Sequence, residues 1–302
     1  MVWVIGGNGM LGTQLCRNLS EKKIDFVSTD RNVDITNLSE LEQFANGKKI
    51  NFIVNCAAYT AVDKAESELS LAEKLNAEGP KNIARLAKKI GSKLIHISTD
   101  YVFNGTGICK KDGTIRPYNE DDPTAPIGVY GLTKEKGEKA VLEETEDFYI
   151  LRTAWLYGFD GKNFVYTMIR AMNTHESVKV VSDQRGSPTF CVDLANVIIK
   201  LIKKDGTIPY GIYHVTNEGE TTWFDFTKEI FAQGTKKGLI TNKSCIINPC
   251  TTQEYPTPAK RPSYSVLNKK KIEDALGEKL PDWQDSLALF LESKNFDHER
   301  IK

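Results

Sequence analysis

The chain has 302 residues with 40 basic and 40 acidic side chains, and hydrophobic residues make up 40% of it. This is the composition of an ordinary folded protein, and the length predicts one large or two coupled domains. The balanced charge argues against a nucleic-acid partner, and no apolar run approaches the roughly 20 residues that span a bilayer. The N-terminus lacks a signal-peptide pattern, and the six cysteines include no Cys-x-x-Cys pair. We therefore expect free thiols, a cytoplasmic location and no membrane partner.

Short β-branched segments alternate with longer helical patterns in the first half of the chain. We predict these strands and helices, in chain order, at residues 2–5, 10–21, 26–28, 51–56, 69–90, 93–98, 131–144 and 149–153. The helical stretch 69–90 should break only at Gly79-Pro80. Alternation of this kind predicts an α/β fold with a doubly wound parallel sheet of the Rossmann type.

The pattern changes after about residue 155, where loops lengthen and prolines begin to cluster. Thr251 to Ser265 reads as an extended surface loop, and Tyr210 to Val215 as a strand that returns to the main sheet. We expect a smaller C-terminal α/β substrate domain beside the nucleotide-binding one. The predicted ranges are 1–155, with roughly 191–216 returning to it, for the Rossmann domain, and 156–190 with 217–302 for the substrate domain.

Glycines follow the first predicted strand and open the first helix. Gly6, Gly9 and Gly12 would permit a tight turn, the close approach of a pyrophosphate and close helix–strand packing, respectively. The helix N-terminus at Met10 and Leu11 offers backbone N–H groups to phosphates. A plain strand–helix turn would also use glycine, but the place of this turn at the first strand–helix junction favours a dinucleotide.

The choice between NADH and NADPH stays open. Asp30 ends the second predicted strand at about the distance expected for an acid that binds the adenosine ribose, which favours NAD. Arg31 follows it and could hold a 2′-phosphate, which favours NADP. A turn carrying a surface ion pair is the structural alternative for both.

Tyr130 and Lys134 are spaced i and i+4, so in a helix they share one face. An ammonium near a phenol lowers its pKa and makes it a general acid/base. Thr99 ends a predicted strand, where the carboxyl ends of a doubly wound sheet line the ligand crevice. The small residues Ala57 and Ala58 end the preceding strand and would let a cofactor lie against the backbone.

These motifs, with several longer segments, resemble the dTDP-4-dehydrorhamnose reductase family of extended short-chain dehydrogenases/reductases. The glycine and Tyr/Lys motifs indicate only the superfamily, whereas the longer segments point to the narrower family. The matching segments span the first two thirds of the chain and are 6–12, 55–66, 98–105, 130–134, 152–158 and 183–189.

The resemblance implies that a nicotinamide cofactor, NADPH or NADH, delivers hydride to C4 of dTDP-4-dehydro-6-deoxy-L-mannose. Tyr130 would donate the proton, Lys134 would lower the pKa of Tyr130 and hold the nicotinamide ribose, and Thr99 would hydrogen-bond the reacting oxygen. Further implied cofactor contacts are Asp34, Ile35, Tyr59 and Asn76, the last at a position that often supports the lysine. Implied sugar-nucleotide contacts are Val62, Asp100, Tyr101, Trp155 and Arg185.

Each of three residues also has a structural interpretation: Trp155 as a core aromatic, Arg185 as a surface ion pair, and Asp34 as the N-cap of a helix over 36–44. Some family members are dimers with an interfacial magnesium held by glutamates, but this chain has Gln14 near one of those positions. An amide is a poor ligand for a hard dication, so we expect no metal, and a homodimer stays open.

Two other functions remain open. One is a related sugar-nucleotide 4-ketoreductase or epimerase. The other is a non-catalytic regulatory subunit that retains the fold, although such a subunit could dispense with Tyr130 or Lys134.

Overall fold

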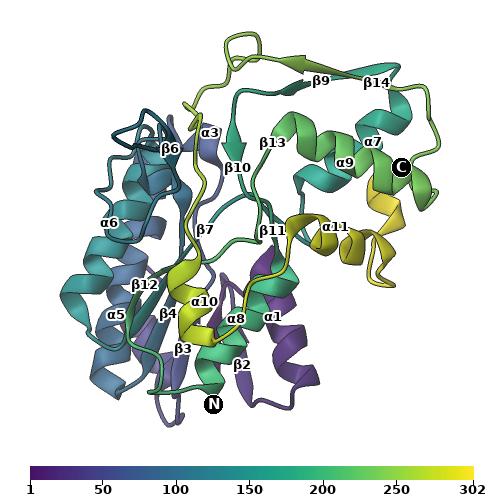
Figure 1. The fold of residues 1–302 in the computed structure, drawn as a ribbon. Coiled ribbons are helices and arrows are strands. Elements are labelled where there is room, and N and C mark those ends of the chain that lie inside the picture. Colours follow the sequence, from purple (N-terminus) through teal and green to yellow (C-terminus); the bar gives the residue numbers. More distant parts are fainter.

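Six parallel strands form the central sheet of the computed structural model, which describes residues 1–302 (Figure 1). Their order across the sheet is β2 (Phe26–Thr29), β1 (Val2–Ile5), β3 (Phe52–Asn55), β4 (Lys93–Thr99), β7 (Phe148–Thr153) and β12 (Gly211–His214). Every residue of β1, β3 and β7 is buried, as expected for a parallel sheet covered on both faces. The predicted Rossmann-type α/β fold is confirmed.

Side chains of alternate residues in β1 enter two separate cores. Val2 and Val4 pack with residues of α1 (Met10–Glu21), α8 (Cys191–Lys203) and α10 (Lys270–Leu276). Trp3 and Ile5 pack on the other face with residues of α2 (Leu38–Ala45), α5 (Gly79–Ile90) and α6 (Val129–Glu144). This twofold alternation is the periodicity of a strand between two helical layers. Figure 1 shows α5 and α6 on one side of the sheet and α1, α8 and α10 on the other.

The helical segment 69–90 does not break at Gly79-Pro80, so that expectation is wrong. It runs from α4 (Leu69–Glu73) through a π-helical turn (Lys74–Glu78) into α5. Gly79 has helical dihedrals, and Pro80 falls in the first turn of α5, where a missing N–H costs little. The irregularity is the π turn, a feature frequent at functional sites.

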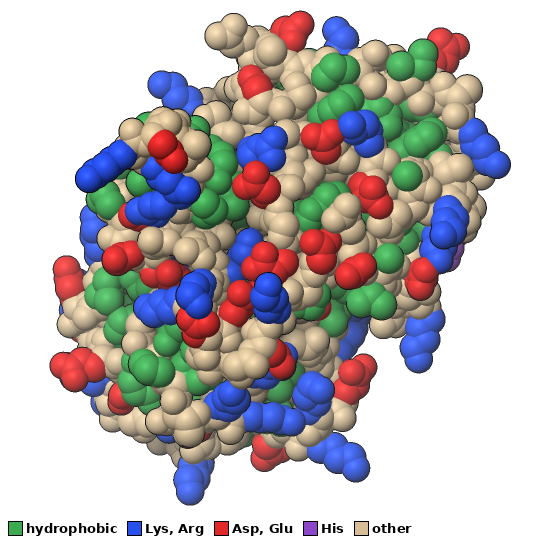
Figure 2. Space-filling view, in the orientation of Figure 1, with side chains coloured by type: hydrophobic (Ala, Val, Ile, Leu, Met, Phe, Trp, Pro, Cys, Tyr) green, Lys and Arg blue, Asp and Glu red, His purple; other side chains and the backbone are tan.

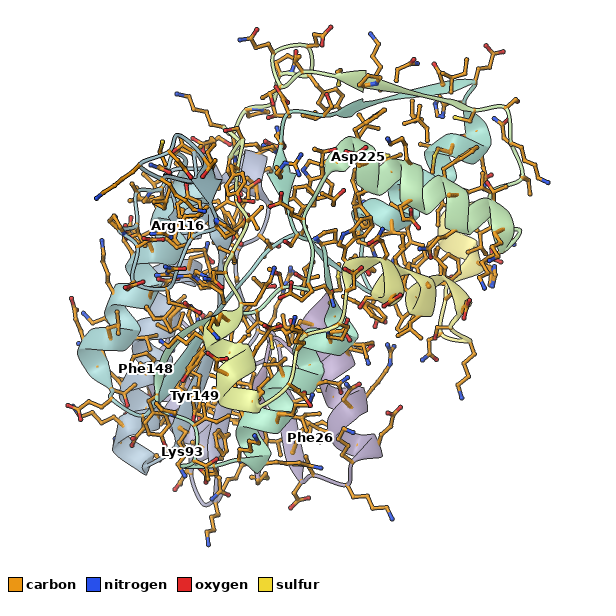
Figure 3. The ribbon with its side chains drawn as sticks, in the orientation of Figure 1. Phe26, Lys93, Arg116, Phe148, Tyr149 and Asp225 are labelled. Carbon is orange, nitrogen blue, oxygen red and sulfur yellow. The ribbon has the colours of Figure 1, made fainter.

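A second core lies beside the carboxyl ends of the sheet strands. It is built mainly from aromatic and aliphatic side chains of α7 (Phe164–Thr174), α9 (Trp223–Lys236) and α11 (Trp283–Glu292). The parallel pair β9 (Ser177–Val181) and β14 (Ile246–Cys250) lies at its outer side (Figure 1). In Figure 3, Lys93 and Phe148, the first residues of their strands, lie low in the view, and Asp225 of α9 lies high. The strands therefore end toward this second unit.

Short elements complete the fold. They are α3 (Val62–Ala65), a 3-10 turn (Asp100–Val102), β5 (Ile108–Cys109), β6 (Ile115–Arg116), β8 (Leu156–Tyr157), β10 (Arg185–Gly186), β11 (Thr189–Phe190), β13 (Thr221–Thr222) and a C-terminal 3-10 turn (His298–Ile301). None of the helices has both the length and the apolar character needed to cross a bilayer.

The division into two domains stays a prediction, with one qualification from the packing. β12 pairs with β7 and α8 packs on α1, in line with a return of 191–216 to the first domain. However, Ile272, Leu276 and Leu280 also belong to the core around β1 and α1. The segment 270–280 thus packs with the nucleotide-binding unit, although it lies within the range expected for the second.

Candidate active site

The glycine turn has the shape that a pyrophosphate requires. Gly6 has φ of +79°, and a Cβ there would lie 2.6 Å from the backbone nitrogen of Ala57. A Cβ on Gly12 would lie 2.1 Å from the carbonyl oxygen of Gly6, so both positions exclude other residues. At Gly9 a Cβ would lie 3.3 Å from the carbonyl oxygen of Gly6, and the residue provides no side-chain cap for α1. The N–H groups of Met10 and Leu11 at this uncapped helix end fit a bound anion.

Asp30 and Arg31 have different surroundings. The Asp30 carboxylate accepts hydrogen bonds from the backbone N–H groups of Asn8 at 3.0 Å and Arg31 at 2.9 Å, so it holds the glycine turn against the end of β2. Arg31 is exposed and forms no ion pair. The two do not form the surface ion pair considered above. Each oxygen of Asp30 thus accepts one backbone hydrogen bond, whereas the guanidinium of Arg31 has no protein partner.

Asp34 and Ile35 support the next loop. Asp34 accepts from both the N–H and the hydroxyl of Thr36 at 2.9 Å, whereas Asn37 is the N-cap of α2. The N-cap interpretation of Asp34 is therefore wrong, because the helix begins later than expected. Ile35 is buried and packs on Gly79, where a Cβ would lie 2.6 Å from its Cδ1.

Asn76 fixes the loop that follows β3. It lies in the π-helical turn and is fully buried, and its side chain accepts from the Tyr59 N–H at 2.8 Å and donates to the Tyr59 carbonyl at 3.1 Å. It also donates to the hydroxyl of Thr133 at 3.1 Å. No hydrogen bond joins Asn76 to Lys134, so it does not support the lysine directly. It positions Tyr59, and with it Ala57 and Ala58, along the edge of the crevice.

The first turns of α6 bring Tyr130 and Lys134 to the end of β4. Close approach depends on Gly131, where a Cβ would lie 2.1 Å from the carbonyl oxygen of Tyr101. The rings of Tyr101 and Tyr130 meet edge to face, with centroids 5.5 Å apart. Thr99 ends β4, and its hydroxyl lies close enough to the phenol of Tyr130 to oppose the rise in the pKa of that group.

Burial dominates the titration of both groups. It raises the pKa of Tyr130 to about 12, and it lowers the pKa of Lys134 to about 8. Lys134 is 2% exposed, and its Nζ donates to the carbonyl oxygen of Ile97 at 2.6 Å. The lowered pKa of Tyr130 that its spacing from Lys134 predicts is therefore not found, because desolvation raises the pKa.

Asp100 lies directly behind this pair. It is 2% exposed, its Oδ1 accepts from the Thr99 hydroxyl at 3.0 Å, and its Oδ2 has no hydrogen-bond partner. Burial raises its pKa to about 6. The hydroxyls of Ser265 and Thr99 oppose this rise in the pKa but do not cancel it.

Trp155 is held in a strained conformation between the two units. Its φ of +48° is in the left-handed region, which residues other than glycine rarely adopt. Its ring stacks on Trp223 of α9 and lies against Gly186, where a Cβ would come within 2.7 Å of the indole. Trp155 is half-buried, so it is neither a simple core aromatic nor a free surface ring.

The last two residues expected to contact the sugar nucleotide are Arg185 and Val62. Arg185 forms an exposed ion pair with Glu220 at 3.0 Å, as its structural interpretation requires. Val62 is half-buried and begins α3, a helix that packs on α6.

Comparisons with known proteins assign the chain to a family. The family described as RmlD substrate binding domain matches residues 1–296. A dTDP-4-dehydrorhamnose reductase from Streptomyces griseus is 42% identical over 95% of this chain and 91% of its own length. A crystal structure of the reductase from Bacillus anthracis in complex with NADP is 40% identical, with a TM-score of 0.86 over 96% of this chain and 97% of that one.

The chain belongs to the dTDP-4-dehydrorhamnose reductase family. A third relative shows how substrates vary at this level of similarity. A probable dTDP-4,6-dihydroxy-2-methyloxan-3-one 4-ketoreductase from Streptomyces antibioticus is 40% identical over 95% of this chain and 93% of its own length.

Gln14, the residue for which the sequence analysis considered an interfacial metal, lies buried within α1. Its amide nitrogen donates to Asn18 at 2.6 Å, and its Oε1 has no partner. No group of three or more metal-ligating side chains occurs in the structure.

Several residues of the reductase site escaped the sequence analysis. His96 contacts Lys134, and Glu138 and Arg152 form an ion pair in which both side chains are 3% exposed. Arg261, from the loop 251–265, forms a two-pronged ion pair with Asp63 of α3 at 2.8 Å and ties the loop to the crevice. These contacts join segments distant in the sequence, and a lone histidine or arginine gives no local signal of them.

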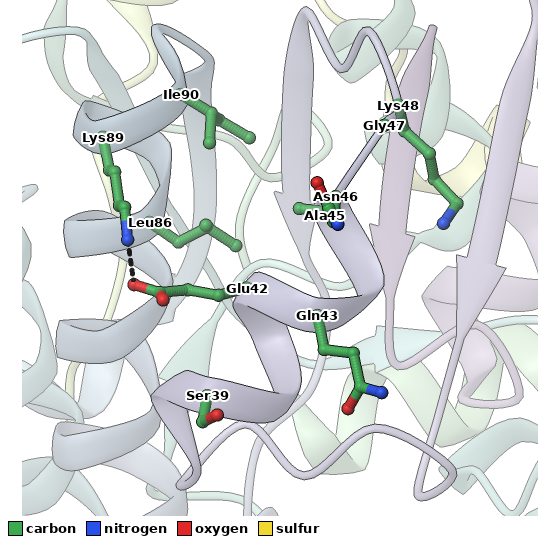
Figure 4. Close-up of a pocket in the computed structure, with 10 residues that line it drawn as sticks. All are labelled: Ser39, Glu42, Gln43, Ala45, Asn46, Gly47, Lys48, Leu86, Lys89 and Ile90. Carbon is green, nitrogen blue, oxygen red and sulfur yellow. Dashed lines mark hydrogen bonds and ion pairs between the residues drawn. The ribbon is translucent and has the colours of Figure 1, made fainter.

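A groove of about 660 Å³ lies elsewhere, between α2 and α5 (Figure 4). Its only labelled ion pair joins Glu42 to Lys89 at 2.8 Å. Lys89 and Ile90 end α5, which returns to the amino ends of the strands, so the groove is on the opposite edge from the reductase site.

On the face in Figure 2, positive and negative side chains are interspersed, without a large patch of one sign.

Proposed function

We propose that this chain reduces the C4 keto group of dTDP-4-dehydro-6-deoxy-L-mannose to give dTDP-L-rhamnose, with NADPH as the cofactor. The observation that carries the proposal is the placement of Thr99, Tyr130 and Lys134 together at the carboxyl end of β4. A pyrophosphate cradle and an indole wall flank this group. A non-catalytic subunit would have no need for such a set.

The glycine cradle fits the cofactor. Gly9 places no side chain at the end of α1, that end is uncapped, and Arg31 is free for a 2′-phosphate. The unpaired charge of Arg31 and the NADP bound by the Bacillus anthracis relative favour NADPH over NADH. When bound, the nicotinamide supplies the hydride for C4.

Tyr130 supplies the proton. Its pKa of about 12 keeps the phenol protonated at neutral pH, and the C4 alkoxide that forms on hydride arrival is basic enough to take that proton. Thr99 donates to or orients the same oxygen, and Lys134 stabilises the resulting phenolate by its charge. We place the sugar between this group and Trp155, with Val62, Asp100 and Tyr101 around it, and assign the diphosphate to Arg185.

The runner-up substrate is another dTDP-linked 4-keto sugar. It is favoured by the Streptomyces antibioticus relative, whose similarity to this chain is nearly as high as that of the reductases. An epimerase or a regulatory subunit has no such observation in its favour.

The test compares two substrates at equal NADPH. One is dTDP-4-dehydro-6-deoxy-L-mannose, and the other is the same nucleotide with the opposite sugar configuration at C3 and C5. The proposal predicts a much larger kcat/KM for the first, with dTDP-L-rhamnose as the product. Preference for the second substrate would support the runner-up, and a lack of NADPH oxidation with either substrate would refute the proposed function.

A further inference from the structure

A chain of hydrogen bonds leads from the backbone of the crevice to Lys134 through two side chains of the central sheet. The N–H of Ala57 donates to Asn55 Oδ1 at 3.1 Å, and Asn55 Nδ2 lies 3.1 Å from His96 Nδ1. His96 Nε2 lies 3.4 Å from Lys134 Nζ. Asn55 and His96 are paired neighbours on β3 and β4, and both are at most 1% exposed.

The network fixes the tautomer of His96. Because Asn55 Oδ1 is used by the Ala57 N–H, the group that Asn55 turns toward His96 is its NH2. An NH2 group only donates, so His96 Nδ1 must accept. Burial and the nearby lysine hold the pKa of His96 well below its usual range, so the ring is neutral. The single ring proton is therefore on Nε2 and points at Lys134.

That contact distinguishes the two states of the lysine. A neutral amine has a lone pair that accepts the Nε2–H, whereas an ammonium has only donors and opposes it. The other nearby partner of Nζ, the carbonyl of Ile97, accepts from either state. The histidine therefore favours the neutral amine.

The other charged groups around Lys134 are committed elsewhere. Glu138, one turn along α6, raises the pKa of Lys134 but is itself paired with Arg152 of β7 at 2.7 Å. From the 3-10 turn, Asp100 acts on Tyr130. In the π-helical turn, the buried Asn76 bonds to Thr133, whereas the charged side chains of Lys74 and Glu78 are exposed.

We propose that Asn55 and His96 are positioning residues that hold Lys134 Nζ and present it with an N–H donor, so that the lysine exchanges a proton near neutral pH. The inference rests on the proposed reductase function. A group whose pKa lies near the working pH performs such an exchange in both directions.

The test measures the titration of Lys134 directly. In apoenzyme with 13Cε-labelled lysine, the resonance that disappears in Lys134→Met is followed by NMR from pH 6 to about 11. His96→Asn keeps an acceptor for Asn55 but removes the Nε2–H. We expect it to raise the Lys134 midpoint by roughly 0.5–1 pH unit, the size of one hydrogen bond. His214→Asn, at another fully buried histidine that does not contact Lys134, should leave the midpoint in place.

An unchanged midpoint in His96→Asn, or an equal rise in His214→Asn, would overturn the proposal. Because His96→Asn could fail to fold, 15N NMR of histidine in the wild-type protein gives a second test, with only four histidines to assign. A neutral ring protonated on Nε2 supports the proposal, and one protonated on Nδ1 overturns it. Neither readout needs turnover, so a failure of the proposed reaction would be seen separately, in the substrate assay.

Discussion

The ring of Trp155 stacks on the ring of Trp223 with centroids 3.6 Å apart and planes 11° from parallel, while the backbone of Trp155 has φ of +48°. The stack joins the end of β7 to α9 and so connects the nucleotide-binding unit to the second unit. Left-handed backbone at a non-glycine residue costs about 1–2 kcal/mol, so packing of the indole must hold it there.

This relationship predicts an unusual order of stability at position 155. Both Trp155→Ala and Trp155→Gly lose the stack, but only glycine adopts the left-handed conformation without strain. Trp155→Gly should therefore be more stable than Trp155→Ala by about 0.5–1 kcal/mol in urea unfolding. Equal stability, or a more stable alanine variant, would show that the backbone strain is absent.

Tyr130→Phe tests the proton donor. The change removes the hydroxyl and leaves the ring that packs on Tyr101. We expect kcat to fall by about 10²–10⁴, the usual contribution of a general acid, with NADPH affinity within about twofold of the wild type. Near-normal turnover in this variant would exclude Tyr130 as the donor.

Arg31→Ala tests the cofactor preference. The exposed guanidinium has no protein partner, so its removal should act on the 2′-phosphate alone. NADPH binding should weaken by roughly 10–100-fold, as for the loss of a charge-assisted contact, while NADH binding stays the same. Arg85→Ala, which removes an arginine paired with Glu144 at 2.9 Å, is the control. An equal loss for both cofactors would contradict the assignment.

Asp100→Asn tests the cost of the buried carboxylate. The folded-state pKa of about 6 exceeds the ordinary value of 3.8, so the folded state binds the proton more tightly than the unfolded state. Wild-type stability from this group is full below pH 4 and falls as pH rises through 6, by up to about 3 kcal/mol. The asparagine variant should therefore be more stable than the wild type at pH 7.5 and lose that advantage near pH 4. A variant that is less stable at both pH values would contradict the account.

Arg152→Met tests the ion pair beneath the site. It leaves Glu138 buried without its partner, and we expect a loss of about 3–5 kcal/mol in the free energy of unfolding. Lys270→Met breaks a pair whose side chains are 75% and 64% exposed, and should change stability by less than about 0.5 kcal/mol. Equal losses in the free energy of unfolding would show that burial of an ion pair does not set its contribution to stability.

The parts of the fold that follow local patterns could be predicted from the sequence. The run Val2 to Ile5, the glycine turn and the helix Met10–Glu21 were predicted with the bounds that the structure has. Strand periodicity and glycine spacing are local signals, so they can be recognised in the sequence without knowledge of the tertiary fold. The place of Thr99 at a strand end followed from the same signals, whereas the helix predicted over 131–144 begins two residues earlier, at Val129, and so includes Tyr130.

What depends on contacts across the chain could not be predicted. The π turn around Asn76 reflects its bonds to Tyr59 and Thr133, and the packing of α10 on the first core depends on segments more than 200 residues apart. The contact between His96 and Lys134 joins a strand to a helix, and a lone histidine in a strand gives no sign of it. The strain at Trp155 likewise arises from its stack on Trp223.

The most direct test of the proposed function traces the hydride. The purified protein is incubated with dTDP-4-dehydro-6-deoxy-L-mannose and NADPH that carries deuterium at the transferable position of the nicotinamide, and the sugar product is analysed by NMR. The account predicts dTDP-L-rhamnose with deuterium at C4, and no such product from Tyr130→Phe on the same time scale. A product labelled elsewhere, or unchanged substrate with bound NADPH, would contradict it.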